Sequence, residues 1–414
     1  MSGLIKTEGA DWSWGQVESA ARALGEELGT KASDADPYVV VQPSSPLTGC
    51  ILVLASIKAG LIPLIDERRL YTGDYPVLHD IDFPITEFLR DRSGASDRQS
   101  TLEGTIGFFT SGSTALPKLI LKSWTALLAE ARTLGTLYEL DKTSKIVSLI
   151  SPFHIYGFLH GWVVPFSLGA SLEQTKVGGD AFGCKEIDLL VTVPALWSPL
   201  ENDLPSLKVR TMVTSGAEFG LQRLARFQNL PSRPERLIDI LGSTETGAIG
   251  YRYLDLGDQE YTLMNTVELD KTDEGYTLRS DFIAPAASVK LSDKIVLTGD
   301  RRFLYQGRSD RVFKYSGKRF SLSEVERNLS SCLGSASVVA AFFADEKMVK
   351  GGCLKAWVVH PEQSLWELRR QYRDSFDTPF PDSLFFVSEF VPEKNGKVTI
   401  SSLLRQTESA EQSI

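Results

Sequence analysis

The sequence predicts an α/β protein, with a large N-terminal domain of mainly parallel sheets with helices on both faces, a β subdomain, and a small α+β domain at the C-terminus. Apolar strand-like runs alternate with helix-like stretches up to residue 240, as in parallel sheets covered by helices. Short β-like runs follow between residues 250 and 297. Residues 321–359 then combine one helix-like stretch with two strand-like runs, which predicts the α+β domain.

The first predicted elements are a helix, a strand, a helix and a strand. Apolar side chains at helical spacing predict a helix over residues 12–29, with Gly29 at its end. The apolar runs at 38–42 and 61–65 flank a second helix-like stretch at 46–58. Together these three segments predict a βαβ unit.

The middle of the chain continues this alternation. Strands are predicted at residues 106–109, 145–150, 188–193, 209–213 and 236–240, and helices at 124–137 and 156–168. Parallel sheets bind ligands beyond the carboxyl ends of their strands, and the candidate site segments begin where these strands stop. Further on, Ser321 and Glu324 have the form of a capping box before a helix at 322–332. Strands are also predicted at 276–279, 294–297, 337–343 and 354–359.

Charge and cysteine usage exclude several classes of protein. The net charge is −9, so the chain lacks the basic excess that nucleic-acid binding requires. The four cysteines form no C-x-x-C pair, which disfavours a zinc site or a disulfide framework and fits a reducing compartment. The sequence has no signal-peptide pattern and no apolar run of about 18 residues, so we expect a cytoplasmic protein without a membrane span.

Residues 104–122 predict a loop that binds phosphate. An apolar strand ends at Thr110, and four hydroxyl side chains then surround Gly112 before Pro117 and Lys118. Hydroxyls and backbone N–H groups donate hydrogen bonds to an anion, and a lysine neutralises its charge. The spacing of a Walker loop is absent. The alternative interpretation is a surface turn rich in serine and threonine.

This string resembles the Thr-Ser-Gly-Ser-Thr-Gly-x-Pro-Lys motif of the adenylate-forming superfamily, which includes acyl-CoA synthetases, aryl-acid ligases, peptide-synthetase adenylation domains and firefly luciferase. Ala115 stands where the family usually has a second glycine. Residues 66–103 are also shorter than relatives would suggest, so we expect a compact member that lacks a strand-helix-strand piece. The resemblance implies that the phosphates of ATP bind Thr110, Ser111, Gly112, Ser113, Thr114 and Lys118, with Thr110 also near Mg²⁺.

Residues 151–157 resemble the family's Pro-x-x-His-x-x-Gly segment. The resemblance implies that His154 is catalytic and that the acid lies against His154, Tyr156, Gly157 and Phe158. A packing role is the alternative for this histidine. Amino-acid-activating relatives have an aspartate in this region for the substrate's α-amine, and no residue of this segment has a carboxylate. The acid should therefore be an aryl or fatty acyl acid without an α-ammonium group.

Two further segments resemble the family's adenine and phosphate loops. Residues 214–219 match the adenine loop, in which Gly216, Ala217 and Glu218 would flank the base; an ordinary strand-to-helix turn is the alternative. Residues 241–247 would supply Gly242, Ser243 and Thr244 to the nucleotide and Glu245 to Mg²⁺. Leu241 stands where the family commonly has an aromatic residue, and a helix N-cap is the alternative role for Thr244.

The remaining site residues lie towards the C-terminus. The resemblance implies that Asp300 and Arg308 bind the ribose, with a salt bridge in a β-turn as the alternative. Lys397, in a Pro-x-x-x-x-Gly-Lys ending, would contact the carboxylate and the α-phosphate. Family members rotate their C-terminal domain, which implies domains at 1–309 (with the β subdomain at about 250–309) and 310–414, a hinge at Asp310, and a thiol channel near Gly317.

These segments together predict an acid–thiol ligase that uses ATP and Mg²⁺. A carboxylic acid would be adenylated with release of pyrophosphate, and the acyl group would pass to coenzyme A or to the phosphopantetheine of an acyl carrier protein. A helical stretch with Arg369, Arg370 and Arg373 could steer either acceptor, and we favour a carrier protein. Two alternatives stay open: an adenylating enzyme with a non-thiol acceptor, and an inactive nucleotide-binding relative.

Overall fold

The computed structural model describes most of the chain, and the described chain forms two compact units. The residues not described are 1–2, 8–9, 32–36, 67–70, 72, 74, 84, 91–101, 111–117, 179–181, 218, 274, 284–286, 309–310, 335, 346–347, 362–363, 392–397 and 412–414. Unit 1 contains residues 1–216, 231–258 and 263–290, and unit 2 contains residues 217–230, 259–262 and 291–414. The expected boundary between residues 309 and 310 falls on residues that are not described, so it stays a prediction.

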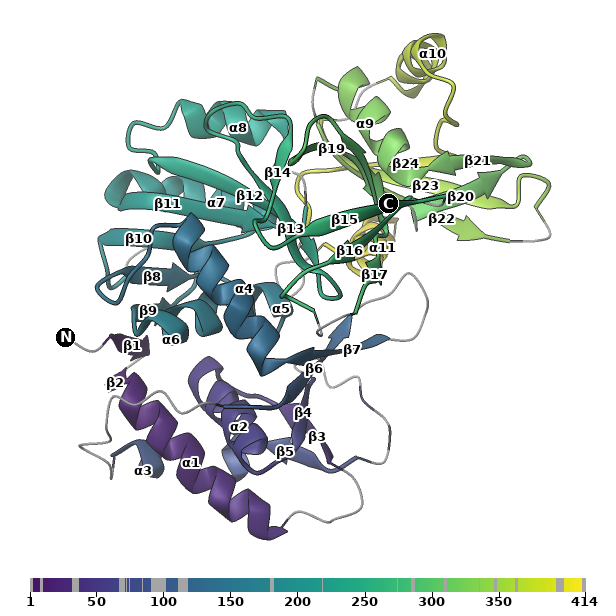
Figure 1. The fold of residues 1–414 in the computed structure, drawn as a ribbon. Coiled ribbons are helices and arrows are strands. Elements are labelled where there is room, and N and C mark those ends of the chain that lie inside the picture. Colours follow the sequence, from purple (N-terminus) through teal and green to yellow (C-terminus); the bar gives the residue numbers. More distant parts are fainter. Residues whose placement is uncertain are drawn as a thin grey trace. The chain divides into compact units, whose positions relative to one another are not determined.

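The first sheet of unit 1 has the strand order β5-β3-β4-β6-β7 (Figure 1). Strands β5, β3, β4 and β6 are parallel, and β7 pairs antiparallel with β6. The predicted βαβ unit is confirmed as β3, α2 and β4. The bounds are α1 Trp14–Lys31, β3 Tyr38–Gln42, α2 Pro46–Lys58, β4 Ile62–Ile65, β5 Val77–His79, η1 Asp80–Asp82, α3 Ile85–Arg90, β6 Thr105–Thr110 and β7 Lys118–Ser123.

Helix α1 packs against α2 and α3 through a continuous apolar face. Val17, Ala20 and Leu24 on this face are fully buried. The predicted end at Gly29 is wrong, because α1 continues to Lys31. A glycine inside a helix costs only about 1 kcal/mol, which the burial of several apolar side chains outweighs.

The second sheet of unit 1 contains the strand order β13-β12-β11-β10-β8-β9-β1-β2. The strands from β12 to β1 are all parallel, which confirms the predicted parallel core. Along the chain, β9 is added on one side of β8, and β10, β11 and β12 are added on the other. The bounds are β1 Leu4–Thr7, β2 Ala10–Ser13, β8 Lys145–Ser148, β9 Ser171–Gln174, β10 Glu186–Val191, β11 Lys208–Ser215, β12 Arg236–Ser243 and β13 Gly247–Tyr253.

Helical segments connect these strands. Their bounds are α4 Trp124–Leu137, α5 Ile155–Phe158, η2 Leu159–Val163, α6 Val164–Leu168, η4 Pro194–Leu196, α7 Trp197–Asp203 and η5 Leu204–Ser206. The helix predicted over residues 156–168 is present, but η2 is one widened π turn between α5 and α6. Such π turns inside helices are frequent at functional sites.

A small antiparallel sheet completes unit 1. Its strands are β15 Glu268–Thr272, β16 Gly275–Arg279 and β17 Val289–Lys290, in the order β15-β16-β17. They lie within the predicted β subdomain.

Unit 2 contains the β18–β19 hairpin and the C-terminal α+β module. The module is a sheet of order β22-β23-β24, a hairpin of β20 and β21, and helices. The bounds are α8 Leu221–Gln228, β14 Tyr261–Leu263 (whose last residue belongs to unit 1), β18 Asp293–Leu297, β19 Arg302–Arg308, β20 Val312–Tyr315, β21 Lys318–Ser321, α9 Leu322–Cys332, β22 Ser337–Ala344, β23 Gly352–Val359, α10 Leu365–Ser375, β24 Ser383–Val387 and α11 Ile400–Glu411.

Arg311 anchors the start of the C-terminal module. Its guanidinium makes two hydrogen bonds to the carboxylate of Glu326, at 2.8 and 2.6 Å. Glu326 also accepts from the backbone N–H of Ala340 on β22. Helix α9 begins after Ser321 as predicted, but the capping box is wrong in one respect, because the Ser321 side chain makes no capping hydrogen bond.

No helix among the described residues is both long and apolar enough to cross a bilayer.

Candidate active site

The ends of the β6–β7 hairpin carry two of the predicted phosphate ligands. Thr110, the last residue of β6, pairs with Lys118, the first residue of β7. The connecting residues Ser111, Gly112, Ser113 and Thr114, together with Ala115, lie outside the described residues. The hairpin therefore places Thr110 and Lys118 side by side at the base of the predicted phosphate loop.

Lys118 forms an ion pair with Glu245, which the sequence predicts as the Mg²⁺ ligand. The Lys118 Nζ and Glu245 Oε1 atoms lie 3.6 Å apart. The side chains are 65% and 33% exposed, so both can reach a ligand from solvent. The fold thus joins two segments that are far apart in the sequence at one charged position.

Glu245 lies in the turn between β12 and β13. Ser243 and Thr246 close this turn: Ser243 N–H donates to Thr246 Oγ1 at 3.2 Å, and Thr246 N–H donates to Ser243 Oγ at 3.3 Å. Thr244 and Glu245 lie between them and are partly exposed. Strand β13 begins directly afterwards, so Thr244 is not a helix N-cap. Gly242 lies at an irregularity in the β12–β13 pairing.

The predicted acid-binding residues lie where the order of the parallel strands changes direction. This position, beyond the carboxyl ends of β8 and β10, is where open α/β sheets bind ligands. His154 precedes α5 and is half-buried. The Tyr156 hydroxyl donates to the carbonyls of Thr192 and Val213, at 3.0 and 3.1 Å, and so joins the ends of β10 and β11.

The other two residues predicted for the acid site are buried. Gly157 is buried in α5, and Phe158 is fully buried, with its ring 5.6 Å from that of Phe108 and 6.5 Å from that of Trp124. The structure therefore gives Phe158 a packing role, and contact between Phe158 and a substrate stays a prediction.

His160 forms a hydrogen bond with the main chain of Tyr156, and its role was not predicted from the sequence. Its Nδ1 donates to the Tyr156 carbonyl, because a carbonyl can only accept, and Tyr138 Oη donates to Nε2; both distances are 3.0 Å. Burial lowers the pKa of His160 to about 4, against the opposing effect of the Tyr156 hydrogen bond. The imidazole is therefore neutral near pH 7. His160 lies in the π turn Leu159–Val163, and no sequence motif marks this position.

The predicted adenine loop follows β11. Gly216 has φ +85°, a conformation that favours glycine, and the chain continues towards α8. Ala217 belongs to unit 2, and Glu218 lies outside the described residues. The segment is a strand-to-helix turn, and its contact with a base stays a prediction.

The structure does not bring Asp300 and Arg308 together. Asp300 lies in the turn of the β18–β19 hairpin, which Thr298 N–H closes by donating to the Arg302 carbonyl at 2.9 Å. Arg308 lies at the other end of β19, and the strand from Arg302 to Arg308 is roughly 20 Å long. Their joint role at one ribose is therefore not supported.

Asp293 lies directly opposite Arg308 and was missed. The two residues are cross-strand partners, and Asp293 is 8% exposed. The register nearer the turn, such as Leu297 opposite Phe303, would place Ser292 opposite Arg308, and an irregularity between Asp293 and Ile295 moves Asp293 into that position. The turn signal in the sequence therefore does not identify Asp293 by itself.

Of the three remaining C-terminal residues predicted for the site, the structure describes only Gly317. Gly317 lies in the exposed two-residue turn between β20 and β21, with φ +83°. Asp310 and Lys397 lie outside the described residues. Their roles as hinge and catalytic lysine stay predictions.

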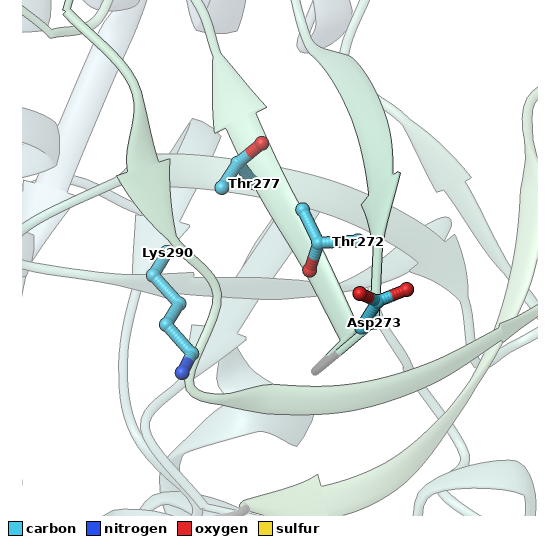
Figure 2. A pocket seen from close by; sticks show the side chains of 4 residues that line it. All are labelled: Thr272, Asp273, Thr277 and Lys290. Atoms are coloured by element: carbon cyan, nitrogen blue, oxygen red, sulfur yellow. The ribbon is translucent and has the colours of Figure 1, made fainter.

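An open pocket of about 380 Å³ lies on the small sheet of unit 1, lined by Thr272, Asp273, Thr277 and Lys290 (Figure 2). None of these residues belongs to a predicted site segment. The lining comes from β15, β16, β17 and the turn after β15, not from the carboxyl ends of parallel strands, so we assign it no part in the site.

Comparison with known families addresses the central part of the chain. Residues 105–274 match the family described as AMP-binding enzyme, a segment that contains the β6–β7 hairpin and the Glu245 turn. The resemblance to the adenylate-forming superfamily is confirmed.

Curated relatives of this superfamily match parts of the chain. A 4-coumarate–CoA ligase from Halorhodospira halophila is 29% identical over 226 residues, which cover 54% of this chain and 56% of the relative. A 3,4-dihydroxybenzoate–(aryl-carrier protein) ligase from Bacillus anthracis is 24% identical over 313 residues, 70% of this chain and 71% of the relative. The chain spans 55–62% of the length of the three 4-coumarate–CoA ligases that it matches.

Solved structures of the superfamily have the same fold. ATP-bound MatB from Rhodopseudomonas palustris has a TM-score of 0.74 at 15% identity, with coverage of 98% of this chain and 96% of that chain. The AMP complex of O-succinylbenzoate coenzyme A synthetase from Bacillus subtilis has a TM-score of 0.74 at 14% identity, with coverage of 96% and 94%. The predicted fold class is confirmed: a large N-terminal α/β domain is followed by a small C-terminal domain.

The residues of the Glu245 turn fit the Mg²⁺ that adenylate-forming enzymes use. Magnesium usually keeps several waters and takes one or two protein carboxylates plus phosphate oxygens, so a single partly exposed carboxylate beside a lysine is an adequate donor set. No cluster of three or more metal-ligating side chains occurs among the described residues, and such a site does not need one.

Proposed function

We propose that this chain is an acid–thiol ligase that forms an acyl-adenylate. The substrate carboxylate attacks the α-phosphorus of ATP and expels pyrophosphate. A thiol then attacks the acyl carbon, and AMP leaves with the carboxylate oxygen that had bridged carbon and phosphorus. The observation that carries this proposal is the Lys118–Glu245 ion pair, because it joins the predicted phosphate loop to the predicted metal carboxylate.

The protein contributes positioning and charge compensation to the first step, since no covalent bond to the protein is required. Lys118 and the hydroxyls of the 110–114 loop hold the β- and γ-phosphates. Glu245 holds Mg²⁺, which neutralises phosphate charge when bound. Thr244 donates to the α-phosphate, and Lys397 compensates the charge of the carboxylate and the α-phosphate.

Ribose binding is the one role that we reassign. We place Asp293, in place of Asp300, with Arg308 at the ribose, because only Asp293 shares a strand end with Arg308. A carboxylate accepts from both ribose hydroxyls, and the guanidinium donates to the hydroxyls and phosphate.

The acid is an aryl or fatty acyl acid without an α-ammonium group. Segment 154–158 offers His154 and the ring of Tyr156 but no carboxylate. The Tyr156 hydroxyl is already bonded to two main-chain carbonyls, and neutral His160 lies behind it. An ammonium group here would find no counter-charge within segment 154–158, which is costly in a partly buried site.

The acceptor is a thiol, either on coenzyme A or on a carrier protein. We favour a carrier protein because α10 exposes Trp366 and three arginines, a surface that suits an acidic protein partner. Arg370 stacks on Trp366, with 5.7 Å between the guanidinium carbon and the ring centroid. Arg369 lies 5.5 Å from the centroid of the Phe380 ring.

The proposal is tested by exchange of labelled pyrophosphate into ATP with a panel of aryl, short-chain and long-chain acids. Exchange that depends on one class of acid is the expected result. Exchange followed by transfer to an amine, or by oxidation, would support the alternative of a non-thiol acceptor. Failure of every acid at saturating Mg²⁺ and ATP would leave the inactive relative as the better account.

A further inference from the structure

The buried underside of the Glu245 turn contains two charged side chains to which the proposed function gives no role. Lys122 on β7 and Glu130 on α4 are only 4% and 2% exposed. Charged side chains are almost never buried to this extent unless they have partners. Their surroundings therefore indicate what they do.

Glu130 holds the start of β13. Its Oε1 accepts a hydrogen bond from the backbone N–H of Ala248 at 2.7 Å. Its Oε2 is buried and makes no hydrogen bond among the described residues. A Cβ atom at Gly247 would lie 2.7 Å from this oxygen, and Gly247 also has φ +69°. Glycine at 247 thus lets the turn that carries Glu245 rest directly on the Glu130 carboxylate.

Lys122 binds the Phe282 segment, which packs against the same glycine, Gly247. Its Nζ donates to the Phe282 carbonyl at 2.6 Å. The Phe282 Cβ atom lies 2.9 Å from where a Gly247 Cβ would be, so the Phe282 segment and Glu130 enclose the same glycine.

The charges influence one another. Burial lowers the pKa of Lys122, and Glu130 and Glu245 oppose this effect. Burial raises the pKa of Glu130, and Lys122 and the Ala248 amide oppose it. Lys118 and Lys122 are four residues apart on one strand and so lie on the same face. Two lysines on one face of β7 thus act near the same turn: Lys118 pairs with the Glu245 carboxylate, and Lys122 binds the Phe282 carbonyl.

We propose that Glu130, together with Lys122, is a positioning residue that fixes the 243–248 turn and thereby sets the place of Glu245. This inference rests on the proposed function for the role of Glu245 with Mg²⁺, but the contact itself does not depend on it. Groups that orient a metal ligand commonly change metal affinity by 10–100-fold when removed.

Glu173 on β9 provides a matched control. It is 7% exposed, its Oε1 accepts from the Gly183 N–H at 2.7 Å, and its Oε2 is buried without a hydrogen bond among the described residues. Glu173 therefore has the same pattern of one bonded and one unbonded carboxylate oxygen, and no hydrogen bond among the described residues links it to the Glu245 turn.

The experiment compares Glu130→Ala, Glu130→Gln and Glu173→Ala in the full chain. We expect amides 246–249 of Glu130→Ala to exchange hydrogen about tenfold faster than in the wild type. The half-saturating Mg²⁺ concentration for pyrophosphate exchange should rise about tenfold. Glu130→Gln keeps an acceptor for Ala248 and should stay within about twofold of the wild type. Glu173→Ala should change neither quantity.

The proposal is overturned if Glu130→Ala leaves both quantities unchanged, or if Glu173→Ala changes them equally. If Glu130→Ala does not fold, Gly247→Ala can be used instead, because its added methyl group would clash with Glu130 Oε2. This variant should show the same faster hydrogen exchange and the same rise in the half-saturating Mg²⁺ concentration. If the wild type shows no pyrophosphate exchange, the proposed function fails, and the hydrogen-exchange comparison still decides whether Glu130 fixes the turn.

Discussion

The Glu245 turn of unit 1 and the β18–β19 hairpin of unit 2 show opposite relations between sequence and space. At the turn, Lys118 and Glu245 come from distant segments, and the fold brings them within 3.6 Å. At the hairpin, Asp300 and Arg308 are close in sequence, and β19 separates them. Lys118 and Glu245 lie at strand ends of two different sheets of unit 1, which tertiary packing brings together, whereas a hairpin places only cross-strand partners next to each other.

The largest effect should come from removing the carboxylate at the turn. Glu245→Ala should lower the turnover of acid-dependent pyrophosphate exchange by on the order of 10²–10³, the usual loss when one preorganised group that stabilises developing charge is removed. Initial rates at saturating ATP measure this. Glu235→Ala, which removes a carboxylate beyond the opposite end of β12, is the control. A loss below about threefold would remove Glu245 from the centre of the account.

The next prediction concerns the hairpin. Asp293→Ala should raise the KM for ATP by about tenfold or more, since a hydrogen bond to a charged group contributes about 1.5–3 kcal/mol. Asp300→Ala should change this KM by less than about twofold. Steady-state exchange kinetics with varied ATP compare the two variants directly. The reverse order would restore Asp300 to the ribose and contradict the assignment by register.

The sequence was sufficient where local pattern and tertiary structure agree. The bounds of β3, α2 and α4 were predicted to the residue, because alternation, capping and apolar spacing all agree there. Lys118 and Glu245 were predicted because each is in a short motif at a strand end.

Other site features depend on relations that one sequence does not contain. Asp293 is defined by cross-strand register, and His160 by a buried network around Tyr156. Glu130 was detectable in principle, because it interrupts the apolar face formed by Leu127, Ala131 and Leu134 on α4. Its partner, the Ala248 amide, was not detectable.

The third prediction concerns the pH dependence of stability that the buried imidazole of His160 causes. The unfolded chain binds a proton at His160 below about pH 6.5, while the folded protein does so only below about pH 4. Stability should therefore fall as pH decreases from 6.5 to 4, by on the order of 3 kcal/mol from this group. Denaturant unfolding of His160→Gln should show a weaker pH dependence in this window than that of the wild type. An unchanged dependence in His160→Gln would contradict the neutral, buried imidazole.

The smallest effect is expected at the acceptor surface. Arg369→Glu combined with Arg373→Glu should raise the KM for a carrier protein severalfold, with pyrophosphate exchange unchanged, because rim charges mainly steer association. The same charge change at exposed Arg132 and Lys142 of unit 1 is the control. The wild-type advantage should fade at high salt. If the double variant and the wild type turn over free coenzyme A equally efficiently, coenzyme A is favoured as the acceptor.

The path of one oxygen atom tests the central claim most directly. An acid selected by the exchange screen is labelled with ¹⁸O in its carboxylate and turned over with ATP, Mg²⁺ and a thiol acceptor. If the carboxylate attacks the α-phosphorus, the bridging oxygen leaves with AMP, and mass spectrometry will find one ¹⁸O atom in each AMP released. Label in inorganic phosphate, or AMP without label, would contradict adenylate formation at this site.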